Sequence, residues 1–171
     1  MEYLDIIDKN NKVIGRASKE DIYAKKLKHR IVHALVFNNQ NKMLLQQRGR
    51  NCNYLPMGWS TSVGGHVQSG ESYKEAAIRE TKEEIGITAT PKLIYQDIYR
   101  DPRNFYKHLE TFKIIHNGPF ITHPHEVEVV KFFTMDEIKK MIKSNELFHP
   151  ELLFLLNKYY QINKSKKPNL N

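Results

Sequence analysis

The stretch that decides the fold runs from Gly65 to Ile87 and reads GHVQSGESYKEAAIRETKEEIGI. Ser72 and, three residues later, Glu75 form the pattern of a capping box, in which both side chains bind backbone N–H groups at the start of a helix. Gly86 is well placed to end that helix, because glycine readily adopts the left-handed backbone of a helix C-terminus. The stretch therefore predicts a helix of about fourteen residues.

Two faces of this helix differ in character. The face expected to pack against a sheet repeats every four residues and consists of Ala77, Thr81 and Ile85. The spacing i, i+3, i+4 places three carboxylates on another face, those of Glu80, Glu83 and Glu84. Like charges at this spacing destabilise a helix by roughly 0.2–0.5 kcal/mol per pair, and a hard divalent cation would reverse that repulsion. The three glutamates are therefore candidate metal ligands.

The alternative reading is a solvated helix whose glutamates pair with basic neighbours, for example Arg79 with Glu83. Spacing alone favours this reading, since such helices are common. The residues before the helix favour a metal, because glycines such as Gly64 and Gly65 let the backbone approach a ligand closely and turn a carbonyl toward it.

The flanking sequence predicts a sheet. Upstream, β-branched and aromatic residues favour strands at 3–8, 12–15, 31–37 and 43–47, with a short helix at 18–27. An asparagine-rich turn makes 31–37 and 43–47 a central hairpin, and 49–58 reads as a surface loop. Downstream, the pattern predicts strands at 94–99, 105–115 and 127–133, helices at 135–143 and from Pro150, and a turn at Asp101-Pro102-Arg103-Asn104. One mixed sheet with helices packed around it, an α+β fold, is the simplest architecture.

Composition narrows the class of protein. The chain has 171 residues, 40% of them hydrophobic, which suits a single globular domain. No apolar run approaches the roughly 20 residues of a membrane span, and the first residues lack the pattern of a signal peptide, so we expect a cytoplasmic protein without a membrane partner. Cys52 is the single cysteine, which agrees with a reducing compartment.

The net charge is +8, yet residues 71–84 carry five glutamates against three basic residues. A basic field attracts phosphate-bearing ligands or nucleic acid, and equally keeps a protein in solution.

Residues 65–87 resemble the signature of the Nudix hydrolases, G-x5-E-x7-R-E-U-x-E-E-x-G-U, where U is an aliphatic residue. The matching positions are Gly65, Glu71, Arg79, Glu80, Glu83, Glu84, Gly86 and Ile87. Only Thr81 departs, where an aliphatic residue is usual, and its hydroxyl will need a hydrogen-bond partner. The resemblance implies an α/β/α sandwich with a mixed central sheet. We expect residues 29–163 to form the Nudix hydrolase domain, residues 1–28 to belong to it as a hairpin and short helix, and residues 164–171 to be a flexible tail.

The resemblance also implies roles. Glu80, Glu83 and Glu84 with the Gly65 carbonyl would bind Mg²⁺ or Mn²⁺, and Arg79 would orient the glutamates in the catalytic centre. Metals of this kind neutralise diphosphate oxygens and lower the pKa of a bound water. The function implied is hydrolysis of a diphosphate linkage in a nucleoside diphosphate derivative or a related organic diphosphate.

A carboxylate must take the proton of the attacking water. Glu80 is the first candidate, and a glutamate at the start of the strand 127–133 is the second, either Glu126 or Glu128. Successive side chains of a strand point to opposite faces, so only one of the two need enter the site, and Glu128 is our choice. The substrate-binding candidates are Arg48, Trp59 and His66.

A second resemblance is to isopentenyl diphosphate isomerase, through the stretch from Trp59 to His66 and the segments 27–30 and 44–48. His33 and His66 fall where that enzyme has metal-binding histidines, but Gly64 stands at its catalytic cysteine. Its paired glutamates would lie on the strand 105–112, where only Glu110 is present. We therefore read an isomerase-like frame with hydrolase chemistry, and keep the isomerase as an alternative.

Another alternative is a non-catalytic nucleotide- or RNA-binding Nudix module, to which the basic charge would contribute, including Lys158, Lys164, Lys166 and Lys167. The clustered glutamates argue against it, so nucleic acid is the less favoured partner. Four aromatic residues are candidates for stacking on a base, although such residues are more often part of a core: Tyr54, Trp59, Phe105 and Tyr106. A homodimer is the default expectation for a compact enzyme.

Overall fold

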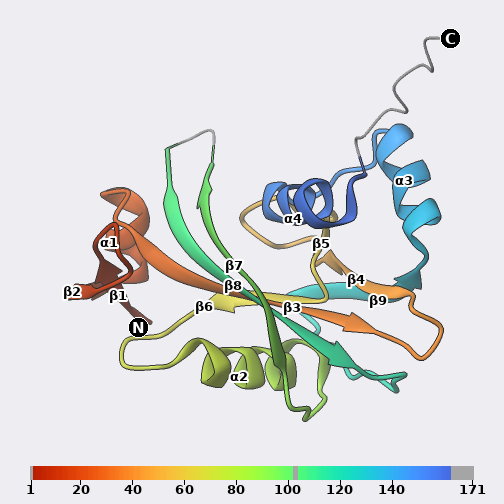
Figure 1. Ribbon diagram of the computed structural model, residues 1–171, viewed down its shortest axis with the longest axis horizontal. Coiled ribbons are helices and arrows are strands. Elements are labelled where there is room, and N and C mark those ends of the chain that lie inside the picture. Colours follow the sequence, from red (N-terminus) through yellow and green to blue (C-terminus); the bar gives the residue numbers. More distant parts are fainter. Residues whose placement is uncertain (1, 102–103, 163–171) are drawn as a thin grey trace, which may run out of the picture.

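The structure is a computed structural model that describes residues 2–101 and 104–162 (Figure 1). The predicted tail at 164–171, with three of the four lysines named above, and the two central residues of the predicted turn at 101–104 lie outside the described residues.

An N-terminal hairpin opens the chain. Strands β1 (Tyr3–Ile7) and β2 (Val13–Ser18) pair antiparallel in a two-stranded sheet. Helix α1 (Lys19–Ala24) follows at once, because the Ser18 side chain accepts a hydrogen bond from the Asp21 N–H at 3.2 Å. The helix ends three residues before the predicted Leu27, since Lys26 adopts a left-handed backbone with φ of 52°.

The central sheet is mixed. Its strands are β3 (His29–Phe37), β4 (Met43–Arg48), β5 (Trp59–Ser60), β6 (Val63–His66), β7 (Lys92–Arg100), β8 (Tyr106–Ile115) and β9 (Val127–Phe133). β3 and β8 run parallel, and the other pairs are antiparallel. The pairing order is β5-β4-β3-β8-β7, with β6 also on β3 and β9 also on β4.

The predicted central hairpin forms, but its strands separate beyond the turn. β3 and β4 pair only at Phe37 and Met43. Farther from the turn β3 pairs with β6, whereas β4 pairs with β5 and β9. The segment 59–66 therefore crosses between the two strands, and the separation leaves room for a site at the middle of the sheet.

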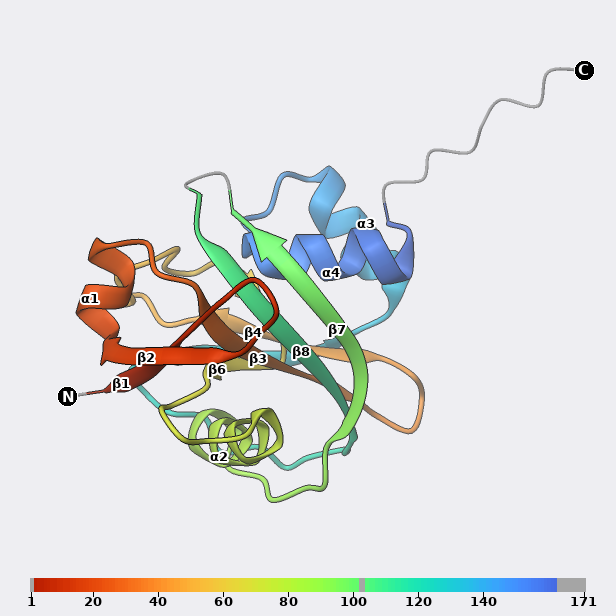
Figure 2. The same ribbon diagram turned by 60° about the vertical axis from the view of Figure 1, so that its left-hand side comes forward.

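Helices cover both faces of this sheet. α2 (Tyr73–Ile85) lies on one face, and α3 (Met135–Lys143) and α4 (Pro150–Tyr160) lie on the other (Figures 1 and 2). Ala34, Val36 and Ile85 belong to the apolar core beneath α2, and Leu35, Leu45 and Leu152 to the core beneath α3 and α4. Successive side chains of β3 therefore point to opposite faces of the sheet and pack into two different cores. This architecture confirms the predicted α+β class and α/β/α sandwich.

The N-terminal hairpin is tied to the loop that precedes α2. Leu4 and Gln68 form an isolated antiparallel bridge, and the Ser69 N–H donates to the Tyr3 carbonyl at 2.8 Å. The buried Asp5 carboxylate accepts from the Ser69 hydroxyl at 2.7 Å.

In the part of the chain that the structure describes, no helix has the length and apolar character of a membrane span.

Candidate active site

The glutamate-rich helix is α2, and its ends are fixed as the sequence predicts. The Ser72 hydroxyl accepts from the Glu75 N–H at 3.3 Å, and the Glu75 carboxylate accepts from the Ser72 N–H at 2.8 Å. At the other end Gly86 has φ of 70°, and its N–H donates to the Lys82 carbonyl. The two ends fix which side chains of α2 face the sheet.

Thr81, the departure from the signature, lies on the buried face of α2 with Ala77 and Ile85. Its hydroxyl donates to the Ala77 carbonyl at 2.6 Å. Because the hydroxyl is satisfied within the helix, threonine at this position leaves no unpaired polar group in the core.

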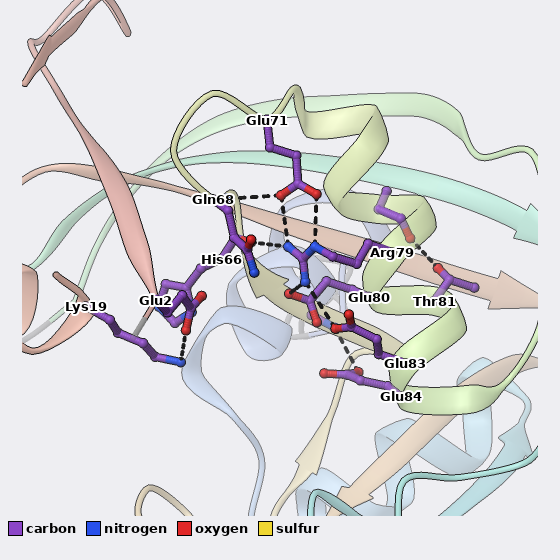
Figure 3. Close-up of polar contacts among 12 residues, drawn as sticks. Glu2, Lys19, His66, Gln68, Glu71, Arg79, Glu80, Thr81, Glu83 and Glu84 are labelled. Carbon is purple, nitrogen blue, oxygen red and sulfur yellow. Dashed lines mark hydrogen bonds and ion pairs between the residues drawn. The ribbon is translucent and has the colours of Figure 1, made fainter. Parts of the chain in front are cut away.

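Arg79 lies at the centre of the site and uses all five of its N–H groups (Figure 3). Nε and Nη2 bind the two oxygens of Glu71, each at 2.9 Å, and Nη2 also donates to the His66 carbonyl at 2.9 Å. Nη1 donates to Glu80 at 2.7 Å and to Glu83 at 3.2 Å. Hydrogen bonding to Glu71 raises the pKa of Arg79 above its usual value. Since every donor is engaged with protein, Arg79 orients other residues instead of offering an N–H group to a ligand.

Glu80 and Glu84 are largely withdrawn from solvent, whereas the Glu83 side chain is 55% exposed. Burial raises the pKa of Glu80, which Arg79 partly offsets, and burial together with Glu80 raises the pKa of Glu84 well above its usual value. One Glu84 oxygen accepts from the Gln46 amide at 3.0 Å and from the Gly64 N–H at 3.3 Å. These bonds direct Glu84 toward the strand β6 that precedes α2.

Gly65 lies against Glu80. A Cβ atom at residue 65 would fall 2.1 Å from the Glu80 Oε1 atom. Because Arg79 holds that carboxylate in place, a side chain at residue 65 would push Glu80 out of its position. The close approach explains why glycine precedes the helix at this spacing.

A cavity of about 740 Å³ collects these groups. It is lined by Glu80, Glu83 and Glu84 from α2 and also by Glu151 from α4, two helices on opposite faces of the sheet. His33 on β3 and Gln46 on β4 line it as well. The cavity therefore occupies the gap between the separated strands β3 and β4, and its volume falls in the range of small-molecule sites.

The donor set fits a hard divalent cation in kind. Carboxylate and carbonyl oxygens are the ligands that Mg²⁺ and Mn²⁺ prefer, and the raised pKa values of Glu80 and Glu84 are what a bound cation would reverse. Within residues 2–101 and 104–162, no group of three His, Cys, Asp or Glu side chains converges as a formed metal site. Arg79 instead holds the Glu80 and Glu83 carboxylates, so a cation would compete with it for their oxygens.

Two of the three predicted substrate-binding residues line the cavity. Arg48 does so while its Nε donates to the Tyr54 carbonyl at 2.9 Å, and His66 does so while it binds the Tyr23 hydroxyl at 2.8 Å. Burial lowers the pKa of His66 well below its usual value, so its imidazole is neutral. Tyr54 lines the cavity too.

Trp59 does not reach the cavity, contrary to the expectation. Its ring packs edge-on against Phe133, and its Nε1 donates to Glu146 at 2.8 Å. A large apolar ring is stabilised more by this core than by a polar cavity wall.

The structure also corrects the choice of Glu128 as the second candidate base. Its side chain is paired with Arg50 at the surface, and it does not line the cavity. Glu126 lines the cavity instead. A bulge between β4 and β9 next to Arg48 offsets the pairing there, so the choice between two neighbouring glutamates could not be read from the sequence.

Three residues that sequence reasoning missed also line the cavity: Tyr23, Lys107 and Glu151. Lys107 and Glu151 form a buried ion pair at 2.7 Å. The available signal was a charge at an inward-facing position, since Lys107 shares one face of β8 with the buried Leu109 and Thr111. Glu151 gives a similar signal, because it precedes the apolar residues of α4.

The fold and the site together define the class of protein. A family model described as the NUDIX domain matches residues 27–156. The chain therefore belongs to the Nudix family.

Curated relatives of the chain are Nudix hydrolases. An uncharacterized Nudix hydrolase of Yersinia pestis is 33% identical over 138 residues, which cover 81% of this chain and 76% of that protein. The uncharacterized Nudix hydrolase YfcD of Escherichia coli is 34% identical over 137 residues, which cover 80% of this chain and 76% of that protein.

Solved structures share the fold. DR0079 from Deinococcus radiodurans superposes with a TM-score of 0.82 at 23% identity and covers 93% of this chain and 99% of its own. The NUDIX domain of Shewanella oneidensis NrtR, in a complex with ADP ribose, superposes with a TM-score of 0.62 at 16% identity and covers 85% of this chain and 98% of its own. At these identities the likeness extends to the fold alone.

Proposed function

We propose that the protein is a divalent-metal-dependent hydrolase that cleaves the diphosphate linkage of a nucleoside diphosphate derivative or a related organic diphosphate, by attack of water at phosphorus. The observation that carries the proposal is the fully engaged Arg79, which links Glu71 to Glu80 and Glu83 beside the cavity. An arginine used in this way fixes the carboxylates in position before a ligand arrives.

Each residue then has a distinct task. Glu80, Glu83 and Glu84, with the Gly65 carbonyl, would hold Mg²⁺ or Mn²⁺. When bound, such a cation neutralises diphosphate oxygens and makes a coordinated water more acidic. Glu80 is the first candidate for the base that takes the proton of the attacking water, and Glu126 replaces Glu128 as the second, because it lines the same cavity.

The test is the release of phosphate, pyrophosphate and nucleoside monophosphate from a panel of nucleoside diphosphate derivatives, dinucleotides and isopentenyl diphosphate, with and without Mg²⁺. We expect metal-dependent cleavage of at least one member, reduced about a hundredfold or more by Glu83→Gln. The matched control is Asp136→Asn on α3, whose side chain is 86% exposed and outside the cavity. It should keep the wild-type rate.

Two outcomes would contradict the proposal. Cleavage that persists in Glu83→Gln at the wild-type rate would show that the reaction does not need the glutamates. Conversion of isopentenyl diphosphate to its isomer, without hydrolysis of any other compound, would favour the isomerase alternative.

The two alternatives find little support in the geometry. Glu110, the remaining acid of the isomerase reading, accepts a hydrogen bond from Gln96 at 3.0 Å and lines a different groove. Neighbours on a strand face opposite ways, so Glu110 cannot join Lys107 and Leu109 on their face of β8. For the RNA-binding reading, Lys158 is paired with Asp97.

A further inference from the structure

The cavity carries a second charged cluster that does not belong to the glutamate helix. It comprises His33 on β3, Lys107 on β8 and Glu151 at the start of α4, and we call it the His33–Glu151–Lys107 cluster. Lys107 Nζ donates to one Glu151 oxygen at 2.7 Å, and His33 Nε2 donates to the other at 2.9 Å. His33 Nδ1 lies 2.9 Å from the Thr61 hydroxyl. The strands β3 and β8 and the helix α4, which are distant in sequence, therefore meet at the Glu151 carboxylate.

Stability alone does not account for this cluster. The exposed fractions are 3% for His33, 6% for Lys107 and 4% for Glu151. Burying an ion pair has a desolvation cost that its attraction often fails to repay, and apolar residues of similar size commonly stabilise a core as well or better. All three residues nevertheless line the cavity. A buried charge pair that lines a cavity is a candidate binding group.

The cluster presents polar groups in fixed positions. An ammonium has three N–H donors, and Lys107 uses one of them on Glu151. The Tyr23 ring, whose centroid lies 5.8 Å from Lys107 Nζ, carries its hydroxyl to His66 on the same cavity wall. Burial alone would lower the pKa of Lys107, but Glu151, Tyr23 and Asp101 together raise it above its usual value, so Lys107 stays charged.

These groups favour a polar partner over a hydrocarbon in the part of the ligand that reaches them. A hydrocarbon placed against the cluster would displace water from a charged pair and return no hydrogen bond, which is costly. A hydroxyl group both accepts from an ammonium and donates to a carboxylate or a phenol oxygen. Sites built to hydrogen-bond a substrate hydroxyl discriminate strongly against analogues that lack it.

We propose that the His33–Glu151–Lys107 cluster, together with Tyr23, binds the organic half of the substrate, and that this half is hydroxyl-bearing, as in a ribose or another sugar, and not a hydrocarbon. The inference rests on the proposed hydrolysis of a diphosphate beside α2 and names its substrate class. Lys107 and Tyr23 are specificity-determining residues in this assignment.

The test is calorimetric binding, in the presence of Mg²⁺, of three probes that share a diphosphonate that water cannot cleave. Methylenediphosphonate is the bare head group, α,β-methylene-ADP carries a ribose, and the butyl ester of methylenediphosphonate carries a hydrocarbon. We expect α,β-methylene-ADP to bind about tenfold or more tightly than the bare head group, and the butyl ester to gain nothing.

The variant Lys107→Met should abolish the advantage of α,β-methylene-ADP and change the affinity for methylenediphosphonate less than about twofold. The control is Lys113→Met on the same strand, whose ammonium lies over the Phe37 ring and outside the cavity. Because Lys107→Met leaves Glu151 charged and buried, Lys107→Met/Glu151→Gln is measured beside it, with thermal unfolding to verify that each variant is folded.

Tighter binding of the butyl ester than of α,β-methylene-ADP would overturn the inference. So would an unchanged preference in the folded double variant, or failure of all three probes to bind. The hydrolysis panel separates the two proposals: a ribose preference that depends on Lys107 in a protein that cleaves nothing supports this inference and removes the proposed function. Hydrolysis by a protein whose ribose preference does not depend on Lys107 supports the proposed function and overturns this inference.

Discussion

Arg79 couples Glu71, in the loop before α2, to Glu80 and Glu83 on the helix itself. Lysine has a single ammonium on a flexible stem and cannot reproduce the two parallel bonds to Glu71. We expect Arg79→Lys to weaken Mg²⁺ activation and lower kcat by about ten- to a hundredfold, with a much smaller effect on KM, because residues that orient metal ligands act through them. Titration of hydrolysis with Mg²⁺ for both proteins gives these values.

Arg16→Lys on β2 is the matched control, since that guanidinium lies over the exposed Tyr3 ring at 5.6 Å and outside the cavity. A KM effect equal to or larger than the kcat effect in Arg79→Lys would show that Arg79 contacts the substrate directly.

Single residues show where sequence reasoning succeeds. The glutamates of α2 and Arg79 fall within nine positions of one another, so helix periodicity alone brings them together. Lys107 and Glu151 are 44 positions apart, and their contact depends on how β8 and α4 pack. Trp59 was misplaced for the same reason, because its partners Phe133 and Glu146 are far along the chain.

Helix α2 ends at a position that only glycine fits well. Gly86 has φ of 70°, and a Cβ there would lie 2.8 Å from both the Cβ and the carbonyl oxygen of Ile121. An alanine would combine left-handed backbone strain with a backbone clash, so Gly86→Ala should lower the free energy of unfolding by about 1–3 kcal/mol. Urea denaturation measures the change.

Gly15→Ala on β2 serves as the comparison, because a Cβ at residue 15 meets only a methyl group of Ile6 at 3.6 Å. We expect a change within about 0.5 kcal/mol. Equal stability of Gly86→Ala and the wild type would mean that the end of α2 adjusts without cost.

Elements with local signals were predicted closely. The predicted ranges 127–133 and 135–143 coincide with β9 and α3, since a run of β-branched and aromatic residues is followed at once by the capping residue Thr134. The strands β5 and β6 were missed, because two to four residues that include Gly64 and Gly65 show no alternation. They form strands only because β3 and β4 are there to pair with them.

The N-terminal hairpin raises the question of whether the whole chain unfolds as one unit, as expected for residues 1–28. The buried Asp5 binds the Ser69 hydroxyl at 2.7 Å and the Gly70 N–H at 3.4 Å, beside Arg30 at 3.9 Å. Asp5→Ala leaves these donors without their acceptor, which should lower the free energy of unfolding by about 1–3 kcal/mol.

Trp59, the single tryptophan, makes this prediction testable because it reports from the core beside α3 and α4, whereas the hairpin lies at the α1 end of the molecule (Figure 1). In one cooperative unit, Asp5→Ala shifts the urea midpoint seen by Trp59 fluorescence and the midpoint seen by far-ultraviolet circular dichroism by the same amount. Asp21→Ala, which removes only an exposed pair with Lys25, should shift both by no more than about 0.5 kcal/mol.

A dichroism change that precedes the fluorescence change, with the Trp59 midpoint unmoved in Asp5→Ala, would show instead that the hairpin melts separately. The loop before α2 would then lose its anchor while the rest of the sandwich stays folded, and the Arg79 contacts to Glu71 would have to survive without it.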